Sequence, residues 1–231
     1  MRIGLAQLRL ENMDKNVRKA LDLLRKSKAD VVVFPELFNT GYNLENISKS
    51  DPKFLIEASK ETKAVIIAGI PEKGYNTALV IHRGKILGRH RKTKLFPLLN
   101  EHKIFKAGKV VKPIETPFGL FGIMICYELR FPEIARKLVN KGAKILFVIA
   151  QFPSERIEHW KVLLRARAIE NQVFVVGVNC VNDHCGGYSM VVDPLGNVLK
   201  ELGDCEAYDE VDINIKYVDE VRKKYPFLNS P

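Results

Sequence analysis

The residue whose side chain is best suited to catalysis is Cys126, which follows an apolar run from Leu120 to Ile125. Pro132 then opens an amphipathic segment, so the pattern predicts a strand, a sharp turn and a helix. This places the thiol at the carboxyl end of a strand, where open α/β sheets hold their reactive groups. A free thiol has a pKa near 8.5 and is only ~3% thiolate at neutral pH, so a nucleophilic Cys126 needs a base beside it.

Histidine is the usual base for such a thiol, but none of the five histidines is favoured. His159 falls within a predicted helix, and His82 and His90 lie in a hairpin that we expect at the surface. Glu36 is a better candidate because it directly follows the buried strand 31–34, the same structural position as Cys126. A partly dehydrated carboxylate there suits a general base, although a surface loop acid stays open as the alternative.

A third candidate is Lys92, which lies where a charged strand gives way to the apolar pair Leu95 and Phe96. A lysine at that border can meet both Cys126 and Glu36, and its ammonium would stabilise a thiolate and a tetrahedral oxyanion. Taken alone, Lys92 also fits a solvated basic strand.

The elements that must position these residues alternate between strands and helices. We predict strands at 2–8, 31–34, 64–70, 75–82, 85–91, 120–125, 145–149, 173–178, 188–192 and 209–213. We predict helices from Asp14 and over 51–62, 132–140, 155–171 and 218–224, with a polar loop at 35–50. The pattern predicts an α/β protein with two helix-covered sheets in a single domain, residues 1–231.

Composition sets the broad class of the chain. The 231 residues are 46% hydrophobic and 28% charged, which is ordinary for a globular protein. The start resembles a first strand rather than a signal peptide, and we expect a cytoplasmic protein. The four cysteines do not form a disulfide framework, and we expect no metal at Cys180, His184 and Cys185 because no second ligand pair with zinc-like spacing exists.

The net charge of +10 raises the possibility of a nucleic-acid-binding protein. The densest basic cluster is residues 82–94, and elsewhere the lysines are scattered among glutamates. No aromatic RNA-binding motif is present, so we expect no nucleic-acid partner and keep this reading as a distant alternative.

Together, three segments resemble the signatures of the carbon–nitrogen hydrolase, or nitrilase, superfamily. They are Phe34-Pro35-Glu36, Arg91-Lys92-x-x-Leu95-Phe96 and Cys126-Tyr127-x-x-Arg130-Phe131-Pro132-Glu133. The resemblance covers nearly the full chain and implies Cys126 as nucleophile, Glu36 as base and Lys92 as electrostatic partner. It also implies a four-layer α-β-β-α sandwich, a homodimer or higher homo-oligomer, and chemistry that needs no cofactor or metal.

The resemblance implies further roles. Glu101 matches the family's second glutamate, thought to support the lysine and the substrate, whereas Lys94 stands where relatives often have His. We expect Glu128 to pair with Arg130 or the backbone, and the helix 155–171 to lie near the subunit interface. The expected substrate-binding residues are Tyr127, Phe38, Tyr42 and Phe152.

The implied substrate is a small amide that forms a thioester with Cys126 and releases ammonia. Local features, among them Phe152-Pro153 and the Arg222 to Pro226 segment, look most like the omega-amidase branch, which acts on 2-oxoglutaramate and 2-oxosuccinamate. A hydrolase of N-carbamoyl amides, aliphatic amides or nitriles from the same superfamily is the alternative.

Overall fold

The computed structural model describes residues 1–229 and contains two six-stranded sheets. The first sheet has the order β12-β1-β2-β3-β4-β5 and the second has the order β11-β10-β9-β8-β7-β6. The first sheet consists of β1 (Arg2–Gln7), β2 (Val31–Val33), β3 (Val65–Glu72), β4 (Tyr75–His82), β5 (Lys85–Arg91) and β12 (Ala207–Asp212). The second consists of β6 (Ile114–Thr116), β7 (Gly119–Ile125), β8 (Ile145–Ala150), β9 (Phe174–Asn179), β10 (Met190–Val192) and β11 (Val198–Glu201).

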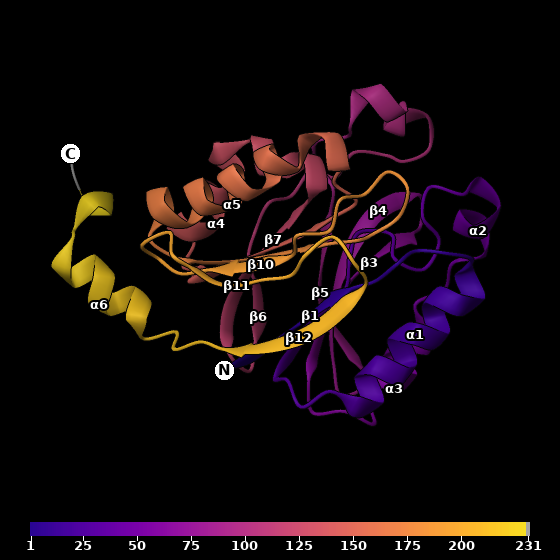
Figure 1. Cartoon of the computed structure of the whole chain (residues 1–231), viewed down its shortest axis with the longest axis horizontal. Coiled ribbons are helices and arrows are strands. Elements are labelled where there is room, and N and C mark those ends of the chain that lie inside the picture. Colours follow the sequence, from indigo (N-terminus) through magenta and orange to yellow (C-terminus); the bar gives the residue numbers. More distant parts are fainter. Residues whose placement is uncertain (230–231) are drawn as a thin grey trace.

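The helices are α1 (Met13–Lys26), α2 (Leu44–Lys49), α3 (Lys53–Ala58), α4 (Pro132–Asn140), α5 (Ile157–Asn171) and α6 (Tyr217–Lys224). Four of them, α1, α3, α4 and α5, cover the outer faces of the sheets (Figure 1). Ala20 of α1 and Leu55 of α3 pack on the first sheet, and Leu138 of α4 and Trp160 of α5 pack on the second. The expected α-β-β-α sandwich is therefore confirmed.

The alternation of side chains along each strand explains why both faces of each sheet are apolar. In β2, Val31 and Val33 point into the central core between the sheets, while Val32 points outward to the core under α1. In β7, Ile123 points into the central core and Met124 points toward α4 and α5. A strand buried on both faces reads as a continuous apolar run, which made these strands recognisable.

Parallel pairing brings several strand ends together. β2 pairs in parallel with β1 and β3, and β8 pairs in parallel with β7 and β9. Glu36 lies just beyond β2, Cys126 directly follows β7 and Gln151 directly follows β8. The two sheets thus deliver polar side chains to one end of the sandwich.

The segment 35–50, expected as one polar loop, has a different structure. Residues 36–40 are buried, and residues 44–49 form α2, which is capped by the Asn43 side chain accepting a hydrogen bond from the Asn46 N–H. A six-residue helix is too short to show helical periodicity. Helix α1 is capped by Asn12 rather than Asp14, and α3 ends at Ala58 rather than near 62.

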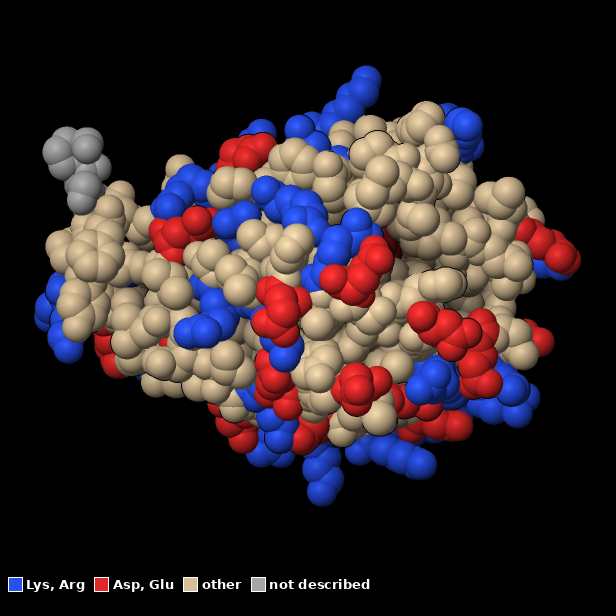
Figure 2. Space-filling model, turned by 45° about the horizontal axis from the view of Figure 1, so that its top comes forward, with Lys and Arg blue, Asp and Glu red and all other residues tan. Residues whose placement is uncertain are grey.

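The basic residues do not form one large patch on the face drawn in Figure 2, where Lys and Arg are interspersed with Asp and Glu. Two members of the 82–94 cluster, His90 and Lys92, are buried against the carboxylates of Glu128 and Glu36. The expectation that the hairpin places His90 at the surface is wrong, because His90 points inward from β5. Within residues 1–229, no helix is both long and apolar enough to cross a bilayer.

Candidate active site

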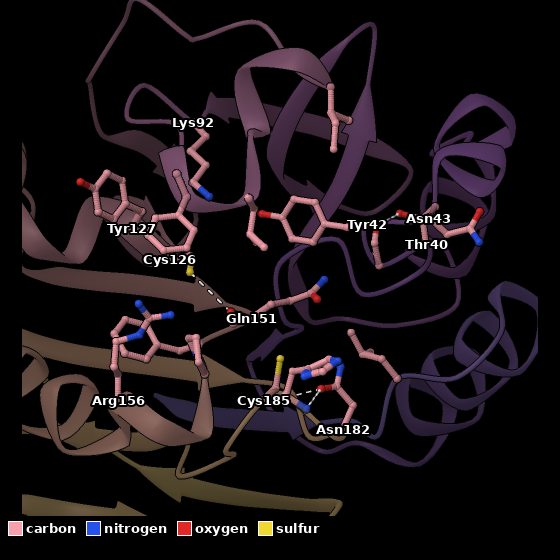
Figure 3. Close-up of a pocket in the computed structure, with 18 of the residues that line it drawn as sticks. Thr40, Tyr42, Asn43, Lys92, Cys126, Tyr127, Gln151, Arg156, Asn182 and Cys185 are labelled. Carbon is pink, nitrogen blue, oxygen red and sulfur yellow. Dashed lines mark hydrogen bonds between the residues drawn. The ribbon is translucent and has the colours of Figure 1, made fainter.

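A cavity of about 690 Å³ opens at the end of the sandwich where the strand ends meet. Cys126, Tyr42 and Tyr127 line it, as Figure 3 shows, and Phe152 does so as well. Phe38 does not, so its expected place in the pocket is wrong. Its ring is fully buried in the core between the first sheet and its helices, 5.0 Å from the Phe34 ring centroid.

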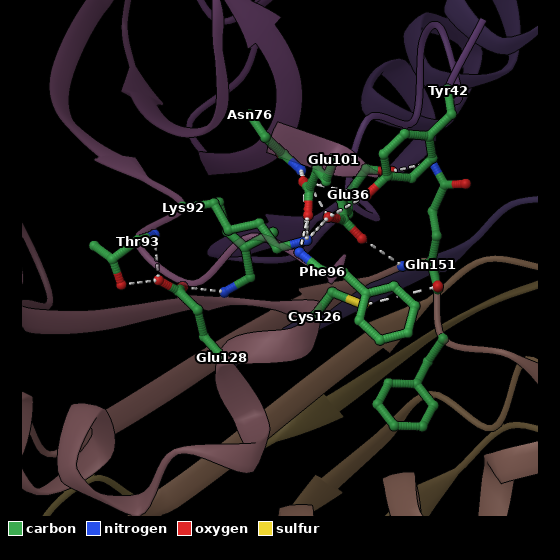
Figure 4. Close-up of polar contacts among 12 residues, drawn as sticks. Glu36, Tyr42, Asn76, Lys92, Thr93, Phe96, Glu101, Cys126, Glu128 and Gln151 are labelled. Atoms are coloured by element: carbon green, nitrogen blue, oxygen red, sulfur yellow. Dashed lines mark hydrogen bonds and ion pairs between the residues drawn. The ribbon is translucent and has the colours of Figure 1, made fainter. Parts of the chain in front are cut away.

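Behind the cavity lies a cluster of three buried charges. The Lys92 Nζ donates to Glu36 Oε1 at 2.8 Å and lies 2.9 Å from Glu101 Oε2 (Figure 4). All three side chains are fully buried, so solvent does not screen the charges. The structure brings together the three charged residues that the sequence singled out, with Glu36 lying 56 positions before Lys92 and Glu101 lying nine positions after it.

Two neutral residues complete this cluster. The Asn76 Nδ2 donates to Oε1 of both Glu36 and Glu101, at 2.7 and 2.8 Å. The Tyr42 hydroxyl lies 3.2 and 3.3 Å from the same two oxygens. Burial raises the pKa of Tyr42, and the negative charges of Glu36 and Glu101 raise it further, so the hydroxyl stays a hydrogen-bond donor. These donors share the carboxylates with Lys92 and fix their orientation.

Gln151 connects the carboxylate to the thiol. Its backbone N–H donates to Glu36 Oε2 at 2.9 Å, and its side-chain amide donates to the Glu36 carbonyl at 2.9 Å. Its own carbonyl accepts from the Cys126 Sγ at 3.8 Å. Glu36 and Cys126 are therefore both anchored to the residue that ends β8.

The backbone at Cys126 turns sharply from β7 into the 3₁₀ turn Cys126–Arg130. Cys126 has φ = 46°, a left-handed conformation that costs a non-glycine residue about 1–2 kcal/mol. Such a conformation persists where the surrounding structure holds it, and it is common at active sites. The turn presents the sulfur to the cavity, as the sequence pattern predicted.

The cluster sets the charge state of the thiol. Burial raises the pKa of Cys126, and the Glu36 carboxylate raises it further. The Lys92 ammonium lowers this pKa only in part, so it stays well above the usual range for a thiol. Burial alone would lower the pKa of Lys92, but Glu36, Cys126 and Glu101 outweigh it and raise the pKa. At neutral pH the cluster therefore holds a thiol and an ammonium, and the thiol must lose its proton to a base during reaction.

Glu128 fixes the two segments that carry the thiol and the ammonium. Its carboxylate accepts from the N–H of Ile125 at 2.8 Å and from the N–H of Thr93 at 2.7 Å. It also accepts from the Thr93 hydroxyl and lies 2.7 Å from the His90 Nε2. The expected backbone contact is present, but the side chain that pairs with the Glu128 carboxylate is that of His90 rather than Arg130.

Burial alone would raise the pKa of the Glu128 carboxyl, but the His90 ring and the hydrogen bonds from Thr93 together lower it. Glu128 is therefore an anchoring carboxylate and not a proton donor.

Sequence reasoning missed Asn76 and Gln151. Asn76 is fully buried near the start of β4, and its only local signal is a polar side chain in a strand that is otherwise largely apolar. Gln151 follows the predicted strand 145–149 at the same carboxyl-end position as Cys126, which is a usable signal. In residues 1–229, no group of three or more His, Cys, Asp or Glu side chains is arranged to hold a metal ion.

Comparison with known proteins identifies the family. A family model described as carbon-nitrogen hydrolase matches residues 2–223. This chain belongs to the carbon–nitrogen hydrolase family. The expected enzyme class, a carbon–nitrogen hydrolase with the family's Glu-Lys-Cys set of residues, is confirmed.

This carbon–nitrogen hydrolase is similar to 2-oxoglutaramate amidase of Bacillus subtilis, with 37% identity over 238 residues covering 93% of this chain and 90% of the relative. It is also similar to omega-amidase NIT2 of Mus musculus, with 33% identity covering 98% of this chain and 93% of the relative. Among solved structures, Nit3 of Saccharomyces cerevisiae, a member of branch 10 of the nitrilase superfamily, superposes with a TM-score of 0.89 at 28% identity. That superposition covers 100% of this chain and 95% of Nit3.

Proposed function

We propose that this enzyme is an omega-amidase that hydrolyses the terminal amide of 2-oxoglutaramate or 2-oxosuccinamate. The observation that carries the proposal is the buried Glu36–Lys92–Glu101 cluster beside a protonated Cys126 at the cavity wall. This arrangement suits acyl transfer from an amide. The similarity to relatives named omega-amidase and 2-oxoglutaramate amidase supports the choice of substrate.

In the first half of the reaction, Glu36 accepts the thiol proton as the Cys126 sulfur attacks the amide carbon. The Lys92 ammonium and the backbone N–H of Tyr127 stabilise the oxyanion, and one such donor lowers the barrier by roughly 3–4 kcal/mol. The tetrahedral intermediate collapses as the C–N bond breaks. Glu36 returns the proton to the departing nitrogen, and ammonia leaves a thioester on Cys126.

In the second half, water takes the place of ammonia. Glu36 accepts a proton from the water as its oxygen attacks the thioester carbon, and the same oxyanion donors stabilise the second tetrahedral intermediate. The C–S bond then breaks, the sulfur regains a proton from Glu36, and the carboxylic acid product leaves. Glu101 and Asn76 hold Glu36 and Lys92 in place throughout.

The proposal is tested with a panel of omega-amides, N-carbamoyl amino acids, aliphatic amides and nitriles. We expect ammonia release to be fastest from 2-oxoglutaramate or 2-oxosuccinamate, and intact mass to show an acyl adduct on the parent enzyme. Cys126→Ala should form no adduct and release no ammonia. Full turnover by Cys126→Ala would overturn the mechanism, whereas a preference for N-carbamoyl amides or nitriles would overturn the substrate and leave the mechanism in place.

We also propose that the enzyme is a homodimer whose subunits meet through α5. The inner face of α5 packs on the second sheet, yet its outer face carries the exposed apolar side chains Val162 and Ile169. Leu195, in the turn between β10 and β11, continues this surface, because Arg165 of the same face donates to the Gly196 carbonyl at 3.1 Å. An apolar patch on an exposed helix face marks an interaction surface.

We further propose a single domain over residues 1–231 and a cytoplasmic location. The family match from 2 to 223 and the central core shared by both sheets support one domain. The cytoplasmic proposal is supported by chemistry, because all four cysteines are unpaired and the mechanism requires a reduced Cys126. Reducing compartments keep such thiols free.

A further inference from the structure

The cavity is lined by more basic side chains than the catalytic cluster contains. Lys92, Arg130 and Arg156 line it, together with one acidic residue, Glu11. The charge of Lys92 is balanced by the carboxylates behind it, and the carboxylate of Glu11 is engaged by two lysines outside the cavity, each at 2.9 Å. The charge available to a bound substrate is therefore that of the two arginines.

Arg156 has hydrogen-bonding capacity that the protein leaves unfilled. It ends the short turn Ser154–Arg156 before α5, and its side chain is 26% exposed. Its Nε is buried without a hydrogen-bond partner, and its ionic contact is with the exposed side chain of Glu155, at 3.3 Å. No hydrogen bond joins the Arg156 guanidinium to the described part of the protein, so the exposed donors of this 26% exposed side chain are available to an acceptor that enters the cavity. Figure 3 shows the Arg156 side chain among the lining residues that surround Cys126.

The second arginine is differently placed. The Arg130 Nη2 lies 3.3 Å from the His159 Nδ1, and the Arg130 guanidinium lies over the Phe152 ring, with 5.5 Å between the guanidinium carbon and the ring centroid. Arg130 thus already has a hydrogen-bond partner in the protein. Arg156 differs because its guanidinium has no hydrogen bond to the described residues, only the ionic contact with Glu155.

An aromatic wall connects Arg156 to the reaction centre. The Arg156 guanidinium carbon lies 5.5 Å from the Phe96 ring centroid, and the Phe96 ring packs 5.1 Å from that of Tyr127, the residue next to Cys126. The Phe96 N–H also donates to Glu101 Oε2 at 2.7 Å. The wall therefore holds the guanidinium in a fixed relation to the catalytic cluster, which suits a site that grips one end of a substrate while the other end reacts.

We propose that Arg156 is the specificity-determining residue that binds the substrate carboxylate remote from the scissile amide. This inference rests on the proposed omega-amidase function and adds to it the group that selects a carboxylate-bearing amide over a neutral one. Guanidinium and carboxylate match in planar geometry and bond through two donors at once, which gives orientation as well as affinity. Arginine and lysine are not equivalent at such a site.

The test compares Arg156→Gln and Arg156→Lys with Arg130→Gln, which removes the other cavity arginine. For each enzyme, kcat/KM is measured for 2-oxoglutaramate, succinamate and butyramide. Succinamate and butyramide differ only at the end remote from the amide, where succinamate has a carboxylate and butyramide has a methyl group. We expect Arg156→Gln to lower the succinamate-to-butyramide ratio by about 10- to 100-fold, mainly through KM, as for a lost charged hydrogen bond. Arg156→Lys should recover part of the ratio, and Arg130→Gln should keep it within about threefold of the parent.

Binding of the product provides a readout that does not depend on turnover. Titration calorimetry of 2-oxoglutarate with Cys126→Ser enzyme should give a weaker Kd when Arg156→Gln is added, and thermal melting shows whether each variant is folded. If the parent hydrolyses 2-oxoglutaramate and Arg156→Gln does so equally well, the role of Arg156 is overturned and the proposed function stands. If Arg130→Gln alone lowers the ratio, the carboxylate site belongs to Arg130. A parent that prefers butyramide to succinamate overturns both proposals.

Discussion

At the scale of single residues, the protonation of Cys126 depends on one carboxylate and one ammonium with opposite effects. Glu36 raises the pKa of the thiol and Lys92 lowers it, with burial acting in the same direction as Glu36. The resting enzyme therefore keeps a thiol rather than a thiolate. Since the thiolate is the form that is alkylated and oxidised, this arrangement protects the nucleophile between turnovers.

Glu36→Gln should separate ionisation from catalysis. The variant removes a negative charge beside the thiol and leaves Lys92 in place, so the pKa of Cys126 should fall and thiolate should appear at lower pH than in the parent. Ammonia release should nevertheless fall by about 10²- to 10⁴-fold, because the general base is lost. The ultraviolet thiolate absorbance, taken as the difference from Cys126→Ser across a pH series, measures the first effect, and a turnover assay measures the second.

Glu101→Gln is the matched control for that experiment. The Glu101 carboxylate also raises the pKa of Cys126, but by less than Glu36 does, so its loss should shift the ionisation in the same direction by a smaller amount. It should keep more turnover than Glu36→Gln because Glu36 still accepts the proton. If thiolate formed in Glu36→Gln only at the same pH as in the parent or at a higher pH, Glu36 would not be raising the pKa of Cys126. Undiminished ammonia release by Glu36→Gln would show that Glu36 is not the base.

At the scale of elements, the position of Glu36 depends on how closely the chain after β2 approaches β3. The Gly69 N–H donates to the Pro35 carbonyl at 3.2 Å, and the Gly69 carbonyl accepts from the Phe38 N–H at 3.0 Å. A Cβ at residue 69 would lie 2.6 Å from the Glu36 Cα, a distance that requires the backbone to move. The missing side chain at Gly69 is what lets this carboxylate reach the cluster.

Gly69→Ala should therefore displace Glu36. We expect the midpoint of thermal unfolding to fall, because overpacking lowers the free energy of unfolding by about 1–3 kcal/mol. We expect turnover to fall by roughly 10²-fold, because the base is displaced by about 1 Å. Gly203→Ala is the control, because a Cβ there meets nothing within 4 Å. Equal turnover in the two alanine variants would show that β3 does not set the position of the base.

Most of the strands and helices, and the positions of Glu36 and Cys126 in the site, could be predicted from the sequence. The buried strands and the helix 132–140 could be predicted because their apolar patterns are local. Glu36 and Cys126 could be chosen as site residues because each follows the carboxyl end of a strand. The contacts of Gln151 with Glu36 join residues 115 positions apart, so no local pattern contains them. The inward direction of His90 was missed because the hairpin was assigned to the surface without fixing which alternate residues of β5 face inward.

At the scale of the whole molecule, the reaction centre exists only where the two sheets meet. Glu36 and Lys92 follow strands of the first sheet, whereas Cys126 and Gln151 follow strands of the second. The central core between the sheets, which includes Val33 of β2, is therefore also what holds the base against the nucleophile. Loss of sheet packing and loss of activity are expected to coincide.

The outer face of α5 allows a matched test of the proposed dimer. Val162 on this face and Val110, which lies in the segment before β6, are 62% and 60% exposed. Val162→Asp places a charge in the proposed interface, where burying it without a partner is costly, whereas Val110→Asp leaves a charge in water. In sedimentation velocity, the parent and Val110→Asp should have twice the mass of one chain, and Val162→Asp should shift toward one chain.

This comparison also locates the interface. A parent that sediments as a single chain at every concentration would show that the apolar α5 face does not pair two copies. A dimer that survives Val162→Asp but is lost in Val110→Asp would move the interface away from α5 toward the segment before β6. Because the α5 face and the cavity are formed by different residues, dissociated Val162→Asp should still form the acyl adduct on Cys126. Loss of the adduct together with the dimer, in a variant that still melts cooperatively, would mean that the second subunit is needed to order the site.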